Sequence, residues 1–204
     1  MYKYGRLNTI IGSLALTMAL LFSACATKVE RVKTDEVIDL SGQWNDTDSR
    51  LVSETMVNEV LAKPWVDDYV RRNSKPPAVI VGEVRNLSHE HLNVNTFLND
   101  VENALINSGR VKVVASRAER EEIREERADQ DINASEETRK AMGKELGADF
   151  MLKGTINTIV DEEGKQAVKF YQVDLTLISL ADNSKVWVGQ KKIKKFVDKR
   201  SLRL

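Results

Sequence analysis

The apolar positions of this chain recur with two periods, one typical of helices and one typical of strands. From Val52 to Val60 every fourth residue is apolar, which predicts a helix with one buried side. Asp46 or Thr47 is expected to cap this helix, since each offers a side-chain oxygen to unpaired amide groups. Lys63-Pro64 is expected to end it, because the residue before a proline avoids the helical conformation.

Two further segments show helical character. Residues 65–72 predict a short helix that lays Trp65 and Tyr69 on the domain, either as core cover or as a recognition surface. A longer helix begins at residues 95–96 and ends near Gly109, which suits a left-handed cap. Its apolar side carries Phe97, Leu98, Val101, Leu105 and Ile106.

Strand-like runs fill most of the remaining domain. Residues 78–84 and 111–115 flank the longer helix, and this strand, helix, strand order favours a parallel pair of strands. The last third contains three runs joined by short polar segments typical of hairpins: 150–160, 167–180 and 186–196. In the middle run the odd positions of 171–177 are apolar and the even positions of 170–176 are mostly polar. That alternation indicates a sheet covered mainly on one side.

Two helices are expected between the second and third strands. Residues 117–129 are almost entirely charged around Ile123, and the next helix begins at 133–135 and ends at 146–147. The order of elements predicts a single α/β domain, residues 47–204, built as a sandwich with helices packed on a mixed sheet. Its N-terminal strands are parallel and its C-terminal strands form an antiparallel meander of three.

The N-terminus has the pattern of a secretory signal. Lys3 and Arg6 precede an apolar run over 10–22, and small residues follow. Phe22-Ser23-Ala24-Cys25 resembles the lipobox of bacterial lipoproteins. The resemblance implies cleavage between Ala24 and Cys25, with lipid on Cys25. An uncleaved anchor or an ordinary buried cysteine are the alternatives, although the apolar run is short for a membrane span.

This interpretation divides the chain into a signal peptide over 1–24, a flexible tether over 25–46 and the domain over 47–204. By resemblance to Gram-negative lipoproteins, Ala26 in place of aspartate favours the periplasmic side of the outer membrane. The chain holds 31 basic and 31 acidic residues, and this neutral balance gives no reason to expect nucleic acid as a partner. A single cysteine excludes a disulfide within the chain.

Two groups of basic residues are candidates for binding a partner. One lies in the charged helix and consists of Arg117, Arg120, Arg124 and Arg127. The other lies near the C-terminus and consists of Lys191, Lys192, Lys194 and Lys195. Each also has a structural interpretation. The helix can simply face solvent, and lysines on an edge strand discourage pairing between sheets.

Catalysis has little support in the sequence. His89-Glu90-His91 is the single histidine cluster, and it is read as a polar loop in preference to a metal site. With no further histidine, no Ser-His-acid triad is persuasive. We therefore expect no catalytic residue, no metal and no cofactor.

The order of elements and three motifs resemble the LpoB family: residues 81–86, residues 143–150 and residues 186–189. Members of that family are outer-membrane lipoproteins that activate bifunctional penicillin-binding proteins, the synthases of peptidoglycan. The resemblance implies a monomeric, non-enzymatic domain whose partner is such a synthase. The domain is also similar to the N-terminal domain of TolB and to CsgG-type lipoproteins, so the alternative is a self-assembling structural or secretion-type envelope lipoprotein. The tether is shorter than the long tails of the best-known activators.

Overall fold

The computed structural model describes residues 29–135 and 145–199. The described residues from Val37 onward belong to one compact unit, and residues 29–36 belong to a separate one. The helices of the larger unit are α2 (Asp46–Leu61), α3 (Trp65–Asn73), α4 (Val94–Asn107) and α5 (Arg117–Asn133). The strands are β1 (Ala78–Asn86), β2 (Lys112–Val113), β3 (Phe150–Glu163), β4 (Gln166–Ser179) and β5 (Lys185–Asp198).

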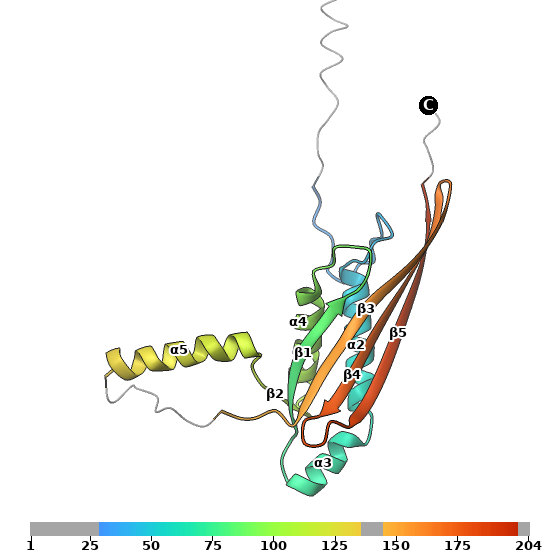
Figure 1. The fold of residues 1–204 in the computed structure, drawn as a ribbon. Coiled ribbons are helices and arrows are strands. Elements are labelled where there is room, and N and C mark those ends of the chain that lie inside the picture. The colour runs from blue at the N-terminus through green and yellow to red at the C-terminus, as the bar shows by residue number, and fades with distance from the viewer. Residues whose placement is uncertain (1–28, 136–144, 200–204) are drawn as a thin grey trace, which may run out of the picture. The chain divides into compact units, whose positions relative to one another are not determined.

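The strands form one mixed sheet in the order β2-β1-β3-β4-β5 (Figure 1). β1 runs parallel to both β2 and β3, whereas β3, β4 and β5 form an antiparallel meander. The expected α/β fold with a mixed sheet is therefore confirmed. Each strand of the meander is 14 residues long, because ladder pairing continues through the charged residues Asp161–Glu163 as far as the turn at Gly164.

One face of the sheet is covered by α2 and α4. α2 packs on β5 and on α4, and α4 packs on β1 and β2. The expected apolar positions of α2 are buried there, as are those of β4 from Tyr171 to Leu177 at odd numbers. Even-numbered residues of β4 therefore point away from these helices. We call the side on which they lie the open face.

Three local predictions are wrong in detail. The cap of α2 is Asn45, not Asp46 or Thr47, and Asn45 and Asp48 exchange the two hydrogen bonds of a capping box. α4 begins after Asn93, before the predicted start at residues 95–96. Ile106, predicted on the buried side, is exposed because that side of the helix is narrower than its run of apolar residues. Gly109 does adopt a left-handed conformation just beyond the end of α4, as expected.

The two helices predicted between the second and third strands have different outcomes. α5 extends four residues beyond the predicted end at Asp129, and none of its residues is buried. The helix is exposed in the chain, as both its solvent-facing and its partner-binding interpretation require. The helix predicted from 133–135 to 146–147 lies largely outside the described residues, as do the signal peptide, Ala24 and Cys25. Within the described residues, no helix is long and apolar enough to cross a membrane.

Candidate functional site

The segment before α2 is fixed to the domain by one aromatic side chain. The ring of Trp44 meets the rings of Tyr171 on β4 and Phe97 on α4 edge to face, at centroid distances of 5.7 and 6.4 Å. We call residues 38–45 the strap. Its last residue, Asn45, also holds Asp39 and the carbonyl of Ile38 through its side-chain amide. These residues belong to the predicted tether over 25–46, whereas in the structure they pack against the domain.

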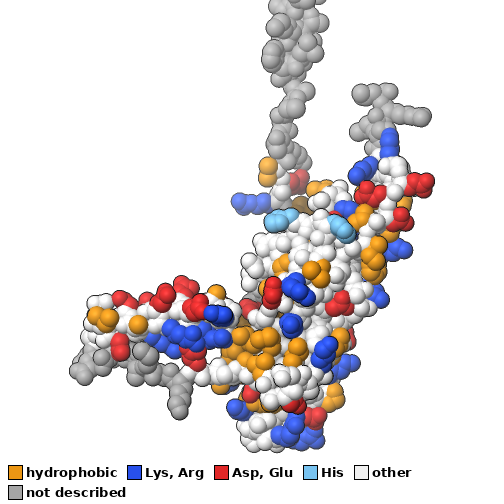
Figure 2. Space-filling view, viewed as in Figure 1, with side chains coloured by type: hydrophobic (Ala, Val, Ile, Leu, Met, Phe, Trp, Pro, Cys, Tyr) orange, Lys and Arg blue, Asp and Glu red, His pale blue; other side chains and the backbone are white. Residues whose placement is uncertain are grey.

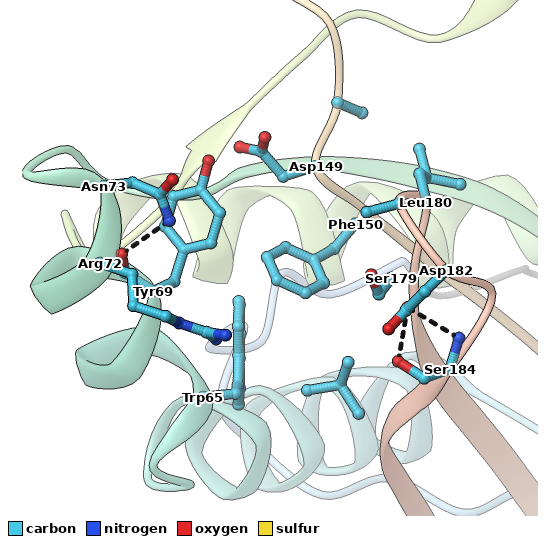
Figure 3. A pocket seen from close by; sticks show the side chains of 13 residues that line it. Trp65, Tyr69, Arg72, Asn73, Asp149, Phe150, Ser179, Leu180, Asp182 and Ser184 are labelled. Atoms are coloured by element: carbon cyan, nitrogen blue, oxygen red, sulfur yellow. Dashed lines mark hydrogen bonds between the residues drawn. The ribbon is translucent and has the colours of Figure 1, made fainter.

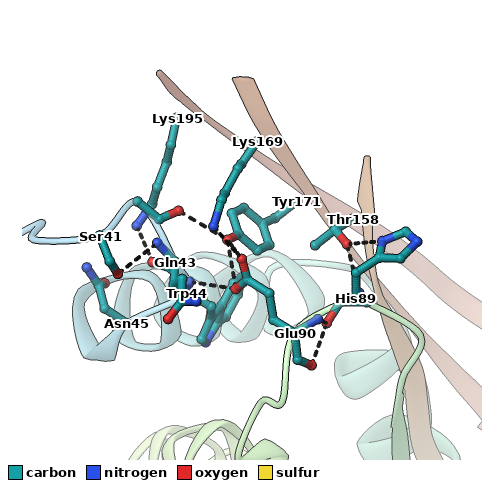
Figure 4. Close-up of polar contacts among 12 residues, drawn as sticks. Ser41, Gln43, Trp44, Asn45, His89, Glu90, Thr158, Lys169, Tyr171 and Lys195 are labelled. Carbon is teal, nitrogen blue, oxygen red and sulfur yellow. Dashed lines mark hydrogen bonds and ion pairs between the residues drawn. The ribbon is translucent and has the colours of Figure 1, made fainter. Parts of the chain in front are cut away.

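A carboxylate beneath the strap collects three donors (Figure 4). Glu90 accepts hydrogen bonds from the Tyr171 hydroxyl at 2.9 Å, from Lys169 Nζ at 2.8 Å and from the Trp44 backbone amide at 3.2 Å. Burial acts to raise the pKa of Glu90, but the hydrogen bonds from Lys169, Tyr171 and Trp44 outweigh it and hold the pKa below its usual value. Burial and the adjacent carboxylate also raise the pKa of Tyr171. Glu90 is thus an ionised carboxylate that links the strap to the sheet through hydrogen bonds.

Lys195 makes a second link from β5. Its Nζ lies 2.7 Å from Asp39 Oδ1, 2.6 Å from Asp48 Oδ2 and 3.0 Å from the Gln43 carbonyl. Only 9% of the Lys195 side chain is exposed. Burial acts to lower the pKa of Lys195, yet hydrogen bonds to Asp39 and Asp48 raise it overall. Lys195, a candidate for binding a partner, therefore has its charge paired with carboxylates inside the domain.

The other lysines of the C-terminal group occupy both sides of β5. Lys191 is half-buried and shares the inward side with Lys195, whereas Lys192 and Lys194 are exposed on the open face. Among the described residues, the ammonium groups of Lys191, Lys192 and Lys194 have no hydrogen-bond or ion-pair partner. β5 is also an outer strand of the sheet, which is where the edge-protection interpretation requires lysines.

The arginines of α5 are mostly paired locally. Arg124 forms a two-pronged contact with Glu145 at 2.7 and 2.8 Å. Arg120 approaches the same carboxylate at 3.8 Å, and Arg117 pairs with Glu121 one turn along the helix. Arg127 also interacts with Glu145 through its charge, which helps to lower the pKa of that carboxylate. Since α5 follows β2 at one edge of the sheet and β5 forms the other, the two basic groups do not make one surface.

The histidine cluster lies in the loop between β1 and α4, as expected. His89 contacts the Thr158 hydroxyl through both its backbone amide and its ring Nδ1. Across the described ranges, no group of three or more His, Cys, Asp or Glu residues is arranged to hold a metal ion. Glu90, between the two histidines, is the residue of this loop that binds the strap, and the sequence did not predict that role. Its partners lie 46 to 81 positions away, so no local pattern marks it.

A pocket of about 630 Å³ opens between α3, the start of β3 and the β4–β5 turn (Figure 3). Phe150 lies at its base, and the rings of Trp65 and Tyr69 meet it edge to face at 5.0 and 5.6 Å. Burial and a hydrogen bond with Asp149 raise the pKa of Tyr69 to about 12. Trp65 and Tyr69 are both buried in the core. Of the two interpretations of these aromatic residues, core cover is therefore confirmed.

Comparison with known proteins assigns the domain. A family model described as peptidoglycan-synthase activator LpoB matches residues 48–193, from the first turn of α2 to Ile193 on β5. The match spans well over half of the chain. The chain belongs to the LpoB family. The family's description is that of an activator, which is a non-enzymatic role, and it indicates a penicillin-binding protein as the class of partner.

Solved structures similar to this LpoB-family chain are distant relatives. The LpoB C-terminal domain from Escherichia coli is 16% identical, with 72% of this chain and 99% of that chain covered and a TM-score of 0.44. Lipoprotein GNA1162 from Neisseria meningitidis is 16% identical over 59% of this chain and 84% of that one, with a TM-score of 0.37. The PelC dodecamer from Paraburkholderia phytofirmans is 14% identical over 59% and 74%, with a TM-score of 0.35. No curated protein sequence matches the chain. The assignment rests on the family model.

Proposed function

We propose that this protein is an outer-membrane lipoprotein that binds and activates a bifunctional penicillin-binding protein. In this proposal residues 1–24 are removed, Cys25 carries lipid and the domain lies on the periplasmic side of the membrane. The observation that carries the proposal is the family match over residues 48–193, which takes in nearly the whole sheet and the helices that cover it. The protein regulates cell wall synthesis through contact alone.

Activation by contact requires differential binding. A domain that docks on a synthase shifts it toward its active conformation only to the extent that it binds that conformation more tightly. The free energy available is therefore limited by the difference between the two affinities. A rigid docking surface favours such a difference, and the long meander of β3, β4 and β5 is a continuous hydrogen-bonded scaffold for one.

The strap sets how far the domain reaches from a lipid on Cys25. Because Asp39 is already held by Lys195 and Asn45, the tether between Cys25 and the domain is about 14 residues long. At about 3.6 Å per residue its fully extended length is roughly 50 Å, whereas a tether free as far as Asn45 would extend to roughly 72 Å. The reach is thus shorter than the sequence alone implies. Either the gap to the inner membrane is small, or a partner in that membrane extends outward to meet this domain.

Binding tests the proposal directly. A soluble fragment should begin at Val37 so that it keeps the strap and the whole of the larger compact unit. We expect saturable binding of this fragment to the bifunctional synthase from the same cell, measured by isothermal titration calorimetry, and a monomer by light scattering. A fragment that binds no such synthase and assembles into rings would contradict the proposal. That outcome would favour the self-assembling envelope lipoprotein instead.

A further inference from the structure

The meander carries exposed apolar side chains on the open face, near its far end. Ile159 on β3 and Phe196 on β5 each have 65% of their surface exposed. Phe170 and Val168 on β4 are half-buried. Exposed apolar residues scattered singly need no explanation, but contiguous ones mark contact surfaces.

The register of the strands makes these residues neighbours. Ile159 pairs with Phe170, and Phe170 pairs with Lys194, so the three form one row across the sheet. Val168 pairs with Phe196 in the row two residues further along. Directly paired residues point to the same side of a sheet, with their β-carbons about 5 Å apart. Since Tyr171, the next residue after Phe170, contacts Phe97 of α4 through Trp44, these rows face away from the helices.

We call Ile159, Val168, Phe170, Phe196, Lys192 and Lys194 the outer patch. Its two lysines follow Phe196 along β5, since Lys194 pairs with Phe170 and Lys192 pairs with Gln172 in the adjacent row. Figure 2 shows hydrophobic, basic and acidic side chains next to one another toward the end of the strands that carries the β3–β4 hairpin. An apolar centre with charges at its border is the usual arrangement of an interface that forms and dissociates.

The outer patch contains two basic residues and no acid, and acids lie at its border toward the hairpin. Asp161 pairs with Val168 in the row of Phe196, and Glu163 and Asp198 pair with Gln166 in the next row. On the other side of the lysines, Asp174 accepts hydrogen bonds from the side-chain amides of Gln172 and Gln190. Lys192 and Lys194 have no such partner among the described residues. A complementary surface therefore has carboxylates placed to meet these ammonium groups.

Edge protection explains only part of this arrangement. Lysines on an outer strand discourage pairing with another sheet, and Lys192 and Lys194 meet that need. Protection gives no reason for Phe196 and Ile159 to be exposed beside them, since an apolar outer strand promotes the association that lysines prevent. The combination of two exposed apolar side chains, Phe196 and Ile159, with two cations fits binding to one specific partner better than the avoidance of all partners.

We propose that the outer patch is the surface through which this protein docks on its synthase, at a site that presents apolar side chains flanked by carboxylates. The inference rests on the proposed function and adds the docking surface to it. Phe196 and Ile159 supply the apolar contact, and Lys192 and Lys194 orient it and speed the encounter.

The test measures binding of the full chain in detergent to the synthase by surface plasmon resonance, at 50 mM and 300 mM salt. We expect Phe196→Ser to weaken binding at least tenfold at both salt concentrations. Lys192→Glu with Lys194→Glu should also weaken it at least tenfold at low salt and less at high salt, because salt screens exposed charges. Urea unfolding midpoints should stay at the wild-type value, because these side chains lie outside the core.

Matched controls come from the other end of the same strand. Val188 is 59% exposed and Lys185 is exposed, and both lie on β5 away from the outer patch. Val188→Ser and Lys185→Glu should bind within twofold of wild type. Wild-type affinity in both patch variants, with a wild type that binds, overturns the docking surface and leaves the proposed function standing. A wild type that does not bind overturns both. A Phe196→Ser variant that loses only self-association assigns the patch to a second copy and also overturns the inference.

Discussion

The two sides of β5 carry lysines in opposite situations. Lys195 points inward, is almost completely buried and holds two carboxylates and a carbonyl of the strap and α2. Lys194, its neighbour in sequence, points to the open face and has no described partner. The alternation of a strand is sufficient to cause the difference, since successive side chains lie on opposite faces. A run of like residues can therefore serve stability on one side and recognition on the other.

Removal of the inward charge should have the largest effect on stability. Lys195→Met leaves Asp48, which is buried, without its cation, and we expect a loss of about 3 kcal/mol in the free energy of unfolding. Lys192→Met is the matched change on the outward side and should cost less than about 0.5 kcal/mol. Urea unfolding of the fragment from Val37 measures both. Equal effects of the two substitutions would contradict the division of β5 into two sides.

The contribution of Glu90 to the free energy of unfolding should be smaller than that of Lys195, and it should depend on pH. Glu90→Gln keeps the shape of the side chain but removes its charge, and we expect a loss of about 2 kcal/mol at pH 7. Because the folded pKa of Glu90 is lowered, its contribution is present above the ordinary glutamate pKa and is lost as pH falls through the folded value. The difference between wild type and variant should therefore shrink between pH 5 and pH 3. Glu163→Gln, an exposed change on the same sheet, is the matched control for the loss of a glutamate charge.

Loss of one hydrogen bond to Glu90 should cost less than loss of its charge. Tyr171→Phe removes the hydroxyl while Lys169 and the Trp44 amide remain, and we expect about 1 kcal/mol. The double variant with Glu90→Gln should lose less free energy of unfolding than the sum of the two single variants. The reason is that both single substitutions remove the same hydrogen bond. Strict additivity in urea unfolding would indicate that the hydroxyl and the carboxylate do not interact.

The smallest effect is expected at a charged pair on the exposed helix. Arg124 and Glu145 make a well-formed contact, but more than half of the Arg124 side chain is exposed and α5 buries no residue. Arg124→Gln should leave the urea midpoint unchanged within error, since exposed pairs contribute little. A clear drop in the midpoint would show that α5 supports the domain, in contrast to the solvent-facing helix described here.

Much of the fold follows from the sequence because its signals are local. Two local patterns each predict a buried face without reference to the rest of the chain. They are the spacing of Val52, Met56 and Val60 and the alternation from Tyr171 to Leu177. Boundaries were less accurate where a charged stretch still forms ladder bonds, as at Asp161–Glu163. Ile106 was wrongly placed because its helix buries only the side that the sheet reaches.

The candidate site was harder to predict for a physical reason. The hydrogen-bond partners of Glu90 are distant in sequence. Together with its neighbours His89 and His91, Glu90 forms a short polar segment that looks like an ordinary loop. The strap has one signal, Trp44, a large aromatic side chain in an otherwise polar stretch. The basic run of β5 was visible, but its division between Lys195 and the outward lysines depends on strand register, which only the assembled sheet fixes.

The rate of glycan polymerisation by the synthase tests the central claim most directly. The fragment from Val37 to Leu204 should be added at increasing concentrations to the purified bifunctional penicillin-binding protein from the same cell, with lipid-linked precursor as substrate. The account predicts a rate that rises and saturates with fragment concentration, at the concentrations where binding saturates. An unchanged rate at full occupancy would show a binding protein that does not activate, and it would contradict the proposed function.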